Sequence, residues 1–213
     1  MILLSDPRVA AVPSRDNGEA MVDLREVPEI RLDGRYADPD GWYARIREAV
    51  LDKLLRAQAM LPDGMRLLIT EAYRPPALQR KYFEGYKDKL RAANPGWDEA
   101  LLHVEASKFV SPPEVAPHGT GGTVDLTLCT PDGVELDMGT AVDASPVDSR
   151  NRCFTASPDV IGEARRNRDA LSKVLLGVGM VNYPTEWWHW SYGDRYWALS
   201  LNATHTRYGP VEL

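Results

Sequence analysis

The chain has 213 residues, of which 44% are hydrophobic and 26% charged, a composition typical of a folded globular protein. Its 31 acidic side chains outnumber the 25 basic ones and give a net charge of −6, which argues against a nucleic-acid-binding protein. No apolar run approaches the roughly 20 residues that a membrane-spanning helix needs. We therefore expect neither nucleic acid nor a membrane as a partner.

Two features bear on the cellular compartment. Cys129 and Cys153 cannot form a disulfide framework, and no paired-cysteine or zinc-finger spacing is present. The N-terminal sequence MILLSDPRVA has too short an apolar start for a signal peptide. A cytoplasmic protein is expected, and a periplasmic one is the alternative if an export signal has been removed from the sequence.

In the first half of the chain, residues 1–38 mix proline, glycine and charges, which predicts an irregular arm with one edge strand near 20–24. From Asp40 to Leu61, apolar residues recur with a 3.6-residue period and predict an amphipathic helix. Residues 65–70 resemble a buried strand. Two prolines follow it and can open a helix over 77–90.

The middle of the chain continues with a short helix expected over 98–107 and a strand over 123–128, where β-branched residues alternate. Residues 129–157 are rich in Pro, Gly, Asp and Ser and predict a long loop, of a length that is usually functional. A helix is expected over 158–177. Its solvated face is expected to carry three arginines: Arg165, Arg166 and Arg168.

Three segments near the C-terminus are rich in aromatic residues and predict strands: 180–183, 186–192 and 196–199. Strands in the middle and at the end, with helices between them, are typical of an α+β protein. We expect one domain over residues 1–213, with residues 1–38 packed on it as an arm. Its centre should be a mostly antiparallel sheet flanked by helices.

The first segment with chemical potential is 116–127, where His118 and Asp125 lie on either side of a glycine-rich turn. An imidazole nitrogen and a carboxylate oxygen are both good ligands for first-row metals. The glycines between them allow sharp folding, so the two side chains can converge although they lie seven positions apart. One interpretation is a metal site, and the other is an ordinary turn before a strand.

The second segment is 184–190, which combines Glu186 and His189 with three tryptophans. Residues three apart point to opposite faces of an extended strand, so a turn or bulge near Glu186 is needed to bring both into one cleft. The tryptophans are either core aromatics or the wall of a pocket. A buried indole N–H needs a hydrogen-bond partner, which makes three such residues costly in a plain core.

These two segments, with Glu186-Trp-Trp-His189 far downstream of His118 and Asp125, resemble the motifs of the zinc-dependent D-alanyl-D-alanine dipeptidases. Those enzymes are relatives of the D,D-carboxypeptidases of bacterial cell-wall metabolism and of the vancomycin-resistance dipeptidase. Three further stretches agree in order and interval: residues 71–75 (EAYRP), 136–140 (LDMGT) and 182–193 (NYPTEWWHWSYG). The resemblance covers the chain from about residue 40 to 200 and implies a hedgehog/D,D-peptidase-like fold.

The resemblance implies that His118, Asp125 and His189 bind one Zn²⁺ per chain. Three protein ligands leave the fourth position open for water, as in catalytic zinc sites. Glu186 would be the general base and then the general acid. Arg74 would face the developing oxyanion, for which its permanent charge and fixed donor geometry suit it.

The remaining polar candidates have weaker or no counterparts. Asp143 resembles the carboxylate that receives the substrate's ammonium group. The family often has Ser two positions before the first zinc histidine, whereas this chain has Ala116, so a hydroxyl contact to the amine is lost. His103 and His205 have no counterpart in these motifs, and packing or surface roles are expected for them. Cys129 is expected to be a buried, inert thiol.

The expected function is therefore that of a zinc metallopeptidase that hydrolyses D-alanyl-D-alanine and similar dipeptides through a metal-activated water. The small dipeptide is its expected partner. The alternative is a D,D- or L,D-carboxypeptidase that acts on peptidoglycan stem peptides, which requires a site open at the amine end. A third hypothesis is a non-catalytic zinc-containing binding module, which would have no reason to keep Glu186 and Arg74 together.

Overall fold

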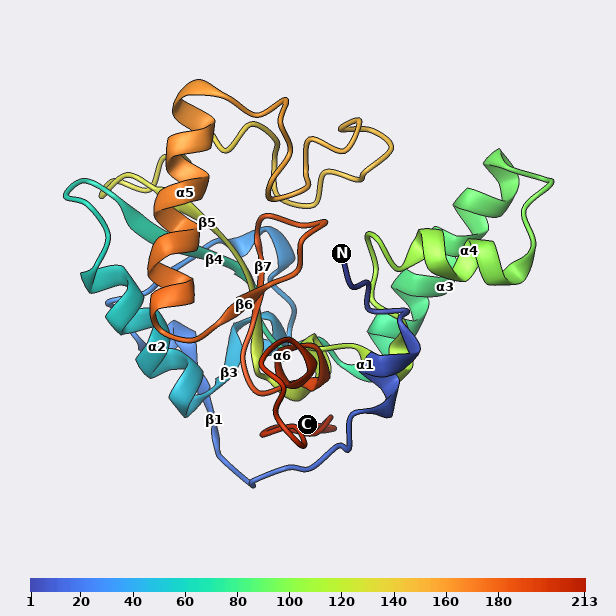
Figure 1. Ribbon diagram of the computed structural model, residues 1–213. Helices are drawn as coiled ribbons and strands as arrows, with labels where there is room; N and C mark the ends of the chain where they lie inside the picture. Colours follow the sequence, from blue (N-terminus) through green and yellow to red (C-terminus); the bar gives the residue numbers. More distant parts are fainter.

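A five-stranded sheet lies at the centre of the computed structural model, which describes residues 1–213 (Figure 1). In spatial order the strands are β2 (Arg31–Leu32), β4 (Arg66–Glu71), β5 (Thr123–Cys129), β7 (His189–Ser191) and β6 (Val181–Asn182). Only β2 and β4 run parallel, and the other neighbours are antiparallel. A separate two-stranded sheet pairs β1 (Met21–Asp23) with β3 (Arg45–Arg47). The mostly antiparallel α+β architecture expected from the sequence is confirmed.

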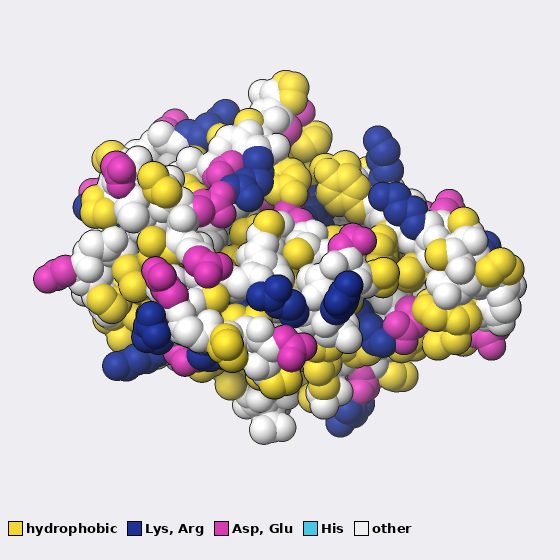
Figure 2. Space-filling model, turned by 90° about the horizontal axis from the view of Figure 1, so that it is seen from above, with side chains coloured by type: hydrophobic (Ala, Val, Ile, Leu, Met, Phe, Trp, Pro, Cys, Tyr) yellow, Lys and Arg dark blue, Asp and Glu magenta, His cyan; other side chains and the backbone are white.

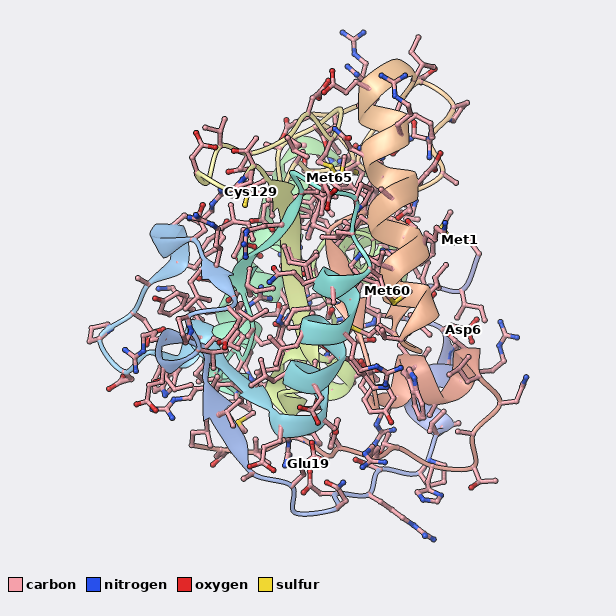
Figure 3. All side chains as sticks on the ribbon, turned by 90° about the vertical axis from the view of Figure 1, so that its left-hand side faces the viewer. Met1, Asp6, Glu19, Met60, Met65 and Cys129 are labelled. Atoms are coloured by element: carbon pink, nitrogen blue, oxygen red, sulfur yellow. The ribbon has the colours of Figure 1, made fainter.

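Six α-helices surround these strands: α1 (Pro7–Ala11), α2 (Glu48–Ala59), α3 (Pro76–Ala93), α4 (Glu99–Ala106), α5 (Gly162–Gly177) and α6 (Arg195–Ser200). Helices α2 and α5 lie side by side against the sheet (Figures 1 and 3). Their apolar faces supply Leu54 and Val174 to the main core, which also contains Ile69 of β4. Burying each such side chain contributes about 1.5–3 kcal/mol. No helix has the length and apolar character that a membrane span requires.

Helices α3 and α4 form a pair that projects away from the sheet, to the right in Figure 1. The pair has a small core of its own, made of Phe83, Leu90, Leu102 and Ala106. Asp98 caps α4, since its side chain accepts a hydrogen bond from the backbone N–H of Leu101. This lobe forms one wall of the cavity described below.

The other predicted elements compare with the structure as follows. The helices expected over 77–90, 98–107 and 158–177 and the strands over 65–70 and 123–128 are present within a few residues. The helix expected from Asp40 begins only at Glu48, because residues 45–47 form β3 instead. There Ile46 pairs with Val22 of β1, and the Arg45 carbonyl accepts a hydrogen bond from the Tyr73 N–H. Ile46 is thus buried as a strand residue, although its position fits the helical period.

The strand expected over 196–199 is wrong, because these residues belong to α6. The side chain of Asp194 accepts a hydrogen bond from the Trp197 N–H at 2.7 Å and so caps the helix. Aromatic content favoured a strand, but the capping residue decides the local structure. The segments 180–183 and 186–192 do contain β6 and β7.

The N-terminal arm is more regular than expected. The edge strand near 20–24 is present as β1, but it pairs with β3 outside the main sheet. Residues 31–32 add β2 to the edge of the main sheet, parallel to β4. Helix α1 lies beside α6, where Val9 is buried together with Tyr196. Short strands and a five-residue helix leave too little periodicity to be seen in a sequence.

Residues 130–161 form a long loop with no helix or strand, as expected, and Arg168 of α5 holds it in place. The Arg168 guanidinium donates to the carbonyl oxygens of Met138 at 2.7 Å, Phe154 at 2.8 Å and Arg152 at 2.9 Å. Its expected place on a solvated face is therefore wrong, since only 1% of the residue is exposed. The planar fork of donors explains why arginine is used here.

Replacing Arg168 by Met is expected to destabilise the protein by about 3 kcal/mol, because three loop carbonyls would lose their donor. The measurement is urea unfolding followed by circular dichroism. Arg166→Met on the same helix is the matched control, since Arg166 is exposed, and its midpoint should stay at the wild-type value. Equal midpoints for the two variants would show that Arg168 does not hold the loop.

Candidate active site

The sheet brings the two downstream candidate ligands together. Along β5, Val124, Leu126 and Leu128 enter the core, so Asp125 points to the opposite face. In the antiparallel pairing of β5 with β7, Asp125 stands directly opposite His189. The His189 Nδ1 atom lies 2.9 Å from Oδ1 of Asp125.

His118 reaches the same place through the turn that precedes β5. Its Nε2 atom lies 3.3 Å from Oδ2 of Asp125. Gly121 has a φ of +69°, a conformation that glycine adopts without strain. At Gly122, a Cβ atom would lie 2.4 Å from the carbonyl oxygen of Tyr192, so no larger residue fits. The glycines of the motif therefore make the turn that places His118 beside the strand.

The donor set fits a divalent metal ion. Each of His118, Asp125 and His189 offers one ligand atom, and these atoms all lie within 4.8 Å of one another. The Nδ1 atom of His118 is 2.5 Å from the carbonyl oxygen of Ala72 and donates to it, which leaves the Nε2 lone pair free to face the site. All three side chains are buried. The metal interpretation of segment 116–127 is thus the one that the geometry favours over a plain turn.

The pKa shifts of Asp125 and His189 favour the forms that bind a metal ion, whereas at His118 the Asp125 carboxylate outweighs burial and raises the pKa. Burial disfavours a charged carboxylate, but the imidazoles of His118 and His189 outweigh it and hold the pKa of Asp125 far below its usual range. Burial lowers the pKa of His189, and the Asp125 carboxylate offsets this only in part. An ionised carboxylate and a neutral imidazole are the forms that bind a cation.

Glu186 lies in a tight turn just before β7. The turn is closed by hydrogen bonds from the Glu186 N–H to Tyr183 O at 3.0 Å and from the His189 N–H to Glu186 O at 3.2 Å. It brings Oε2 of Glu186 to 3.6 Å from Nδ1 of His189, so the turn expected from the sequence is present. Burial, and then the negative charges of Asp125 and Asp143, raise the pKa of Glu186 well above its usual value. A bound cation would favour the ionised form.

The three tryptophans next to Glu186 divide between the two interpretations that the sequence left open. Trp188 lines the cavity at the site. Trp187 and Trp190 belong to the main core, together with Trp188. Both have partners for their indole N–H groups: Trp187 donates to the Thr140 hydroxyl at 2.8 Å and Trp190 to the Trp187 carbonyl at 3.0 Å. They therefore hold the long loop and the turn against the sheet.

Arg74 follows β4 by three residues and lies close to Asp125. Its guanidinium donates to Oε1 of Glu71 and to Oε1 of Gln79, each at 2.8 Å, and it lies 3.9 Å from Oδ2 of Asp125. A second bond runs from Nη2 to Oε2 of Glu71, so the ion pair is bidentate. Sequence reasoning missed Glu71 and Gln79. Glu71 stands opposite Asp125 in the β4–β5 pairing, where an unpaired second carboxylate would be costly.

Asp143 comes from the long loop and faces the same cavity. Burial, followed by the nearby Asp125 charge, raises its pKa to about 6. The Tyr36 hydroxyl donates a hydrogen bond to its carboxylate. Tyr36 was also missed, because it comes from the N-terminal arm and nothing in its local sequence connects it to a loop more than a hundred residues away.

A single cavity of about 450 Å³ unites these groups. All six residues proposed from the sequence line it: Arg74, His118, Asp125, Asp143, Glu186 and His189. His103 lies outside it on α4, against Phe83, and His205 lies in the C-terminal tail. Cys129 is a buried free thiol at the far end of β5 (Figure 3). All three residues lie outside the cavity.

A family model described as D-ala-D-ala dipeptidase, peptidase family M15, matches residues 19–209. The chain belongs to this peptidase family. It is therefore a hydrolase, and the resemblance drawn from the short motifs is confirmed over nearly the whole length.

Two similar proteins carry the name D-alanyl-D-alanine dipeptidase. One, from Synechocystis sp., is 28% identical over 95% of this chain and 96% of its own length. The other, from Escherichia coli, is 26% identical over 79% of this chain and 82% of its own length. A solved structure of VanYB in complex with D-alanine-D-alanine aligns with 77% of this chain and 79% of its own, at 17% identity and a TM-score of 0.45.

Proposed function

We propose that this peptidase is a zinc-dependent D-alanyl-D-alanine dipeptidase. The observation that carries the proposal is the convergence of His118, Asp125 and His189 with Glu186 and Arg74 on one buried cavity. A set of two imidazoles and one carboxylate is a ligand combination that zinc accepts, and three ligands are typical of a catalytic zinc. The names of the two relatives support the substrate.

His118, Asp125 and His189 would hold the zinc ion. When bound, Zn²⁺ polarises a carbonyl group and lowers the pKa of water from 15.7 to about 7. The contact from His118 Nδ1 to the Ala72 carbonyl fixes the orientation of one imidazole ring. The pairing of β5 with β7 fixes Asp125 relative to His189.

Glu186 moves the proton. Its carboxylate accepts the proton of the water whose oxygen attacks the peptide carbonyl carbon. It then delivers this proton to the nitrogen as the C–N bond breaks, so that the leaving residue departs as an amine. The position of Oε2, 3.6 Å from Nδ1 of His189, places the base next to the reacting groups.

Arg74 and Asp143 meet the charges of the substrate. Negative charge develops on the carbonyl oxygen during attack, and the Arg74 guanidinium supplies a permanent positive charge for it. The carboxylate of Asp143, which the Tyr36 hydroxyl orients, suits the free ammonium group of a dipeptide. A substrate with a free amine one residue before the scissile bond is thereby favoured over a longer chain.

Purified protein is expected to hydrolyse D-Ala-D-Ala, to leave L-Ala-L-Ala nearly intact and to lose activity after dialysis against a chelator. Adding Zn²⁺ should restore activity, because the three ligands are preformed. The measurement is alanine release, with metal content determined in parallel. A pentapeptide ending in D-Ala-D-Ala serves as the comparison substrate.

Two outcomes would contradict this proposal. Cleavage of the pentapeptide alone would make the enzyme a carboxypeptidase and would remove the role of Asp143 at the amine. Full activity in a chelated sample without detectable metal would refute the zinc mechanism.

A further inference from the structure

One wall of the cavity is a face of α3 that the proposed mechanism does not use. Lys81, Gly85 and Lys89 recur every four residues, so they lie on the same side of the helix. All three line the cavity, together with Tyr86 of α3 and Phe109. The wall therefore combines two lysines with two aromatic side chains.

Neither ammonium group of this wall has an ionic partner within the chain. No carboxylate oxygen lies within 4.0 Å of the Nζ atom of Lys81 or Lys89, whereas Lys87 of the same helix pairs with Glu84 at 2.9 Å and with Glu99 at 3.6 Å. In Figure 2, Lys and Arg side chains gather beside exposed hydrophobic side chains on the inner flank of the lobe that carries α3 and α4.

The acidic side chains and the two lysines lie at different ends of the cavity. Its four carboxylates all belong to the catalytic end: Glu71, Asp125, Asp143 and Glu186. Glu71 pairs with Arg74, and Asp143 is assigned to the substrate's ammonium group. The remaining cations of the cavity are Lys81 and Lys89. A ligand that places its ammonium group at Asp143 and extends toward α3 would therefore meet unpaired positive charge there.

The distance between Lys81 and Lys89 along α3 is larger than the length of a dipeptide backbone. Eight residues of helix separate Lys81 from Lys89, which corresponds to about 12 Å along the axis. An extended dipeptide backbone spans at most about 7 Å, so its single α-carboxylate occupies only part of this wall. A leaving residue with a second carboxylate can place one anionic group near each lysine, because lysine side chains are long and flexible.

We propose that the α3 wall is a specificity subsite that favours dipeptides whose C-terminal residue has an acidic side chain. One lysine binds the α-carboxylate and the other binds the side-chain carboxylate. Gly85 leaves the room between them: a Cβ atom at this position would meet no atom within 4 Å. The inference rests on the proposed dipeptidase function, because it assigns the leaving side of the substrate to α3.

The test compares D-Ala-D-Glu with its neutral isostere D-Ala-D-Gln. We expect kcat/KM to favour D-Ala-D-Glu in the unchanged protein, and the ratio to fall about 5- to 10-fold in the double variant Lys81→Met/Lys89→Met. The preference should also weaken at high salt, because the lysines are exposed. Lys173→Met is the matched control, since Lys173 is an exposed lysine of α5 outside the cavity, and it should leave the ratio unchanged.

Binding affinities measured without turnover distinguish a failure of this inference from a failure of the proposed function. Both peptides are titrated calorimetrically into zinc-loaded Glu186→Gln protein, with and without the two lysine changes. A preference for D-Ala-D-Glu that disappears with the lysines supports the subsite even if turnover is slow. An equal affinity for the two peptides overturns the subsite, whereas failure of the unchanged enzyme to cleave any dipeptide overturns the proposed function.

A second variant tests the room between the two lysines rather than their charge. Gly85→Leu fills the middle of the wall and adds no strain, since Gly85 lies within α3 and has no positive φ. It should lower kcat/KM for D-Ala-D-Glu at least 5-fold more than for D-Ala-Gly, whose leaving residue has no side chain. Equal losses for the two peptides would contradict the placement of the leaving side chain at α3.

Discussion

Replacing Glu186 by Gln is expected to lower kcat for D-Ala-D-Ala by about 10²–10⁴-fold while the protein still binds one zinc ion. Glutamine keeps the shape and can fill the same turn, but it cannot accept the proton of the attacking water. The metal should remain, because the three ligand atoms belong to His118, Asp125 and His189. The measurements are steady-state kinetics and metal analysis of the same preparation.

Glu163→Gln is the matched control for this experiment. Glu163 is an exposed residue in the first turn of α5, remote from the cavity, and its change should leave both kcat and zinc content at the wild-type level. Loss of zinc from the Glu186→Gln protein would mean that Glu186 is itself a ligand. An unchanged kcat would remove Glu186 from proton transfer.

Local rules predicted the segments that carry the ligand set, whereas the family resemblance identified the ligands themselves. Glycines between His118 and Asp125 predicted a turn, and β-branched residues predicted the strand that follows. The geometry of Glu186 and His189 required a turn, and one is present. What local rules could not supply was the pairing of β5 with β7, which places Asp125 opposite His189. The family resemblance supplied that link instead.

The residues that support the site were not predictable in the same way. Tyr36 reaches Asp143 from the N-terminal arm, and Gln79 reaches Arg74 from α3. Such contacts depend on tertiary structure and leave no periodic signal. Arg168 is a similar case, since it resembles any other arginine of a helix until the loop folds over it.

The two misassigned segments have a common physical cause. Ile46 fits the apolar period of a helix, and residues 196–199 fit the composition of a strand. In both places a specific hydrogen bond decides the structure: the pairing of β3 with β1, and the cap that Asp194 provides to α6. Periodicity and composition indicate which side chains are buried, but they do not indicate which backbone groups form hydrogen bonds with one another or with a capping side chain.

Arg74 has a proposed catalytic role and a structural role, and a single substitution would remove both at once. It faces the reacting centre, 3.9 Å from Asp125, and it neutralises Glu71 in a buried, bidentate ion pair. Removing the guanidinium alone leaves the Glu71 charge without a partner, which typically costs 3–5 kcal/mol of stability. A fall in activity of that variant would therefore also be expected from partial unfolding.

The double variant Glu71→Leu/Arg74→Met separates these roles, because replacing both charges by apolar side chains of similar volume is often neutral for stability. We expect its unfolding midpoint and zinc content to stay near those of the wild type, while kcat for D-Ala-D-Ala falls about 10²–10³-fold. Arg74→Lys should retain part of the rate, since it keeps the charge but loses the fork of donors. A stable, zinc-loaded double variant with wild-type kcat would show that Arg74 only neutralises Glu71. A low kcat in that stable variant would assign the guanidinium to the developing charge on the carbonyl oxygen.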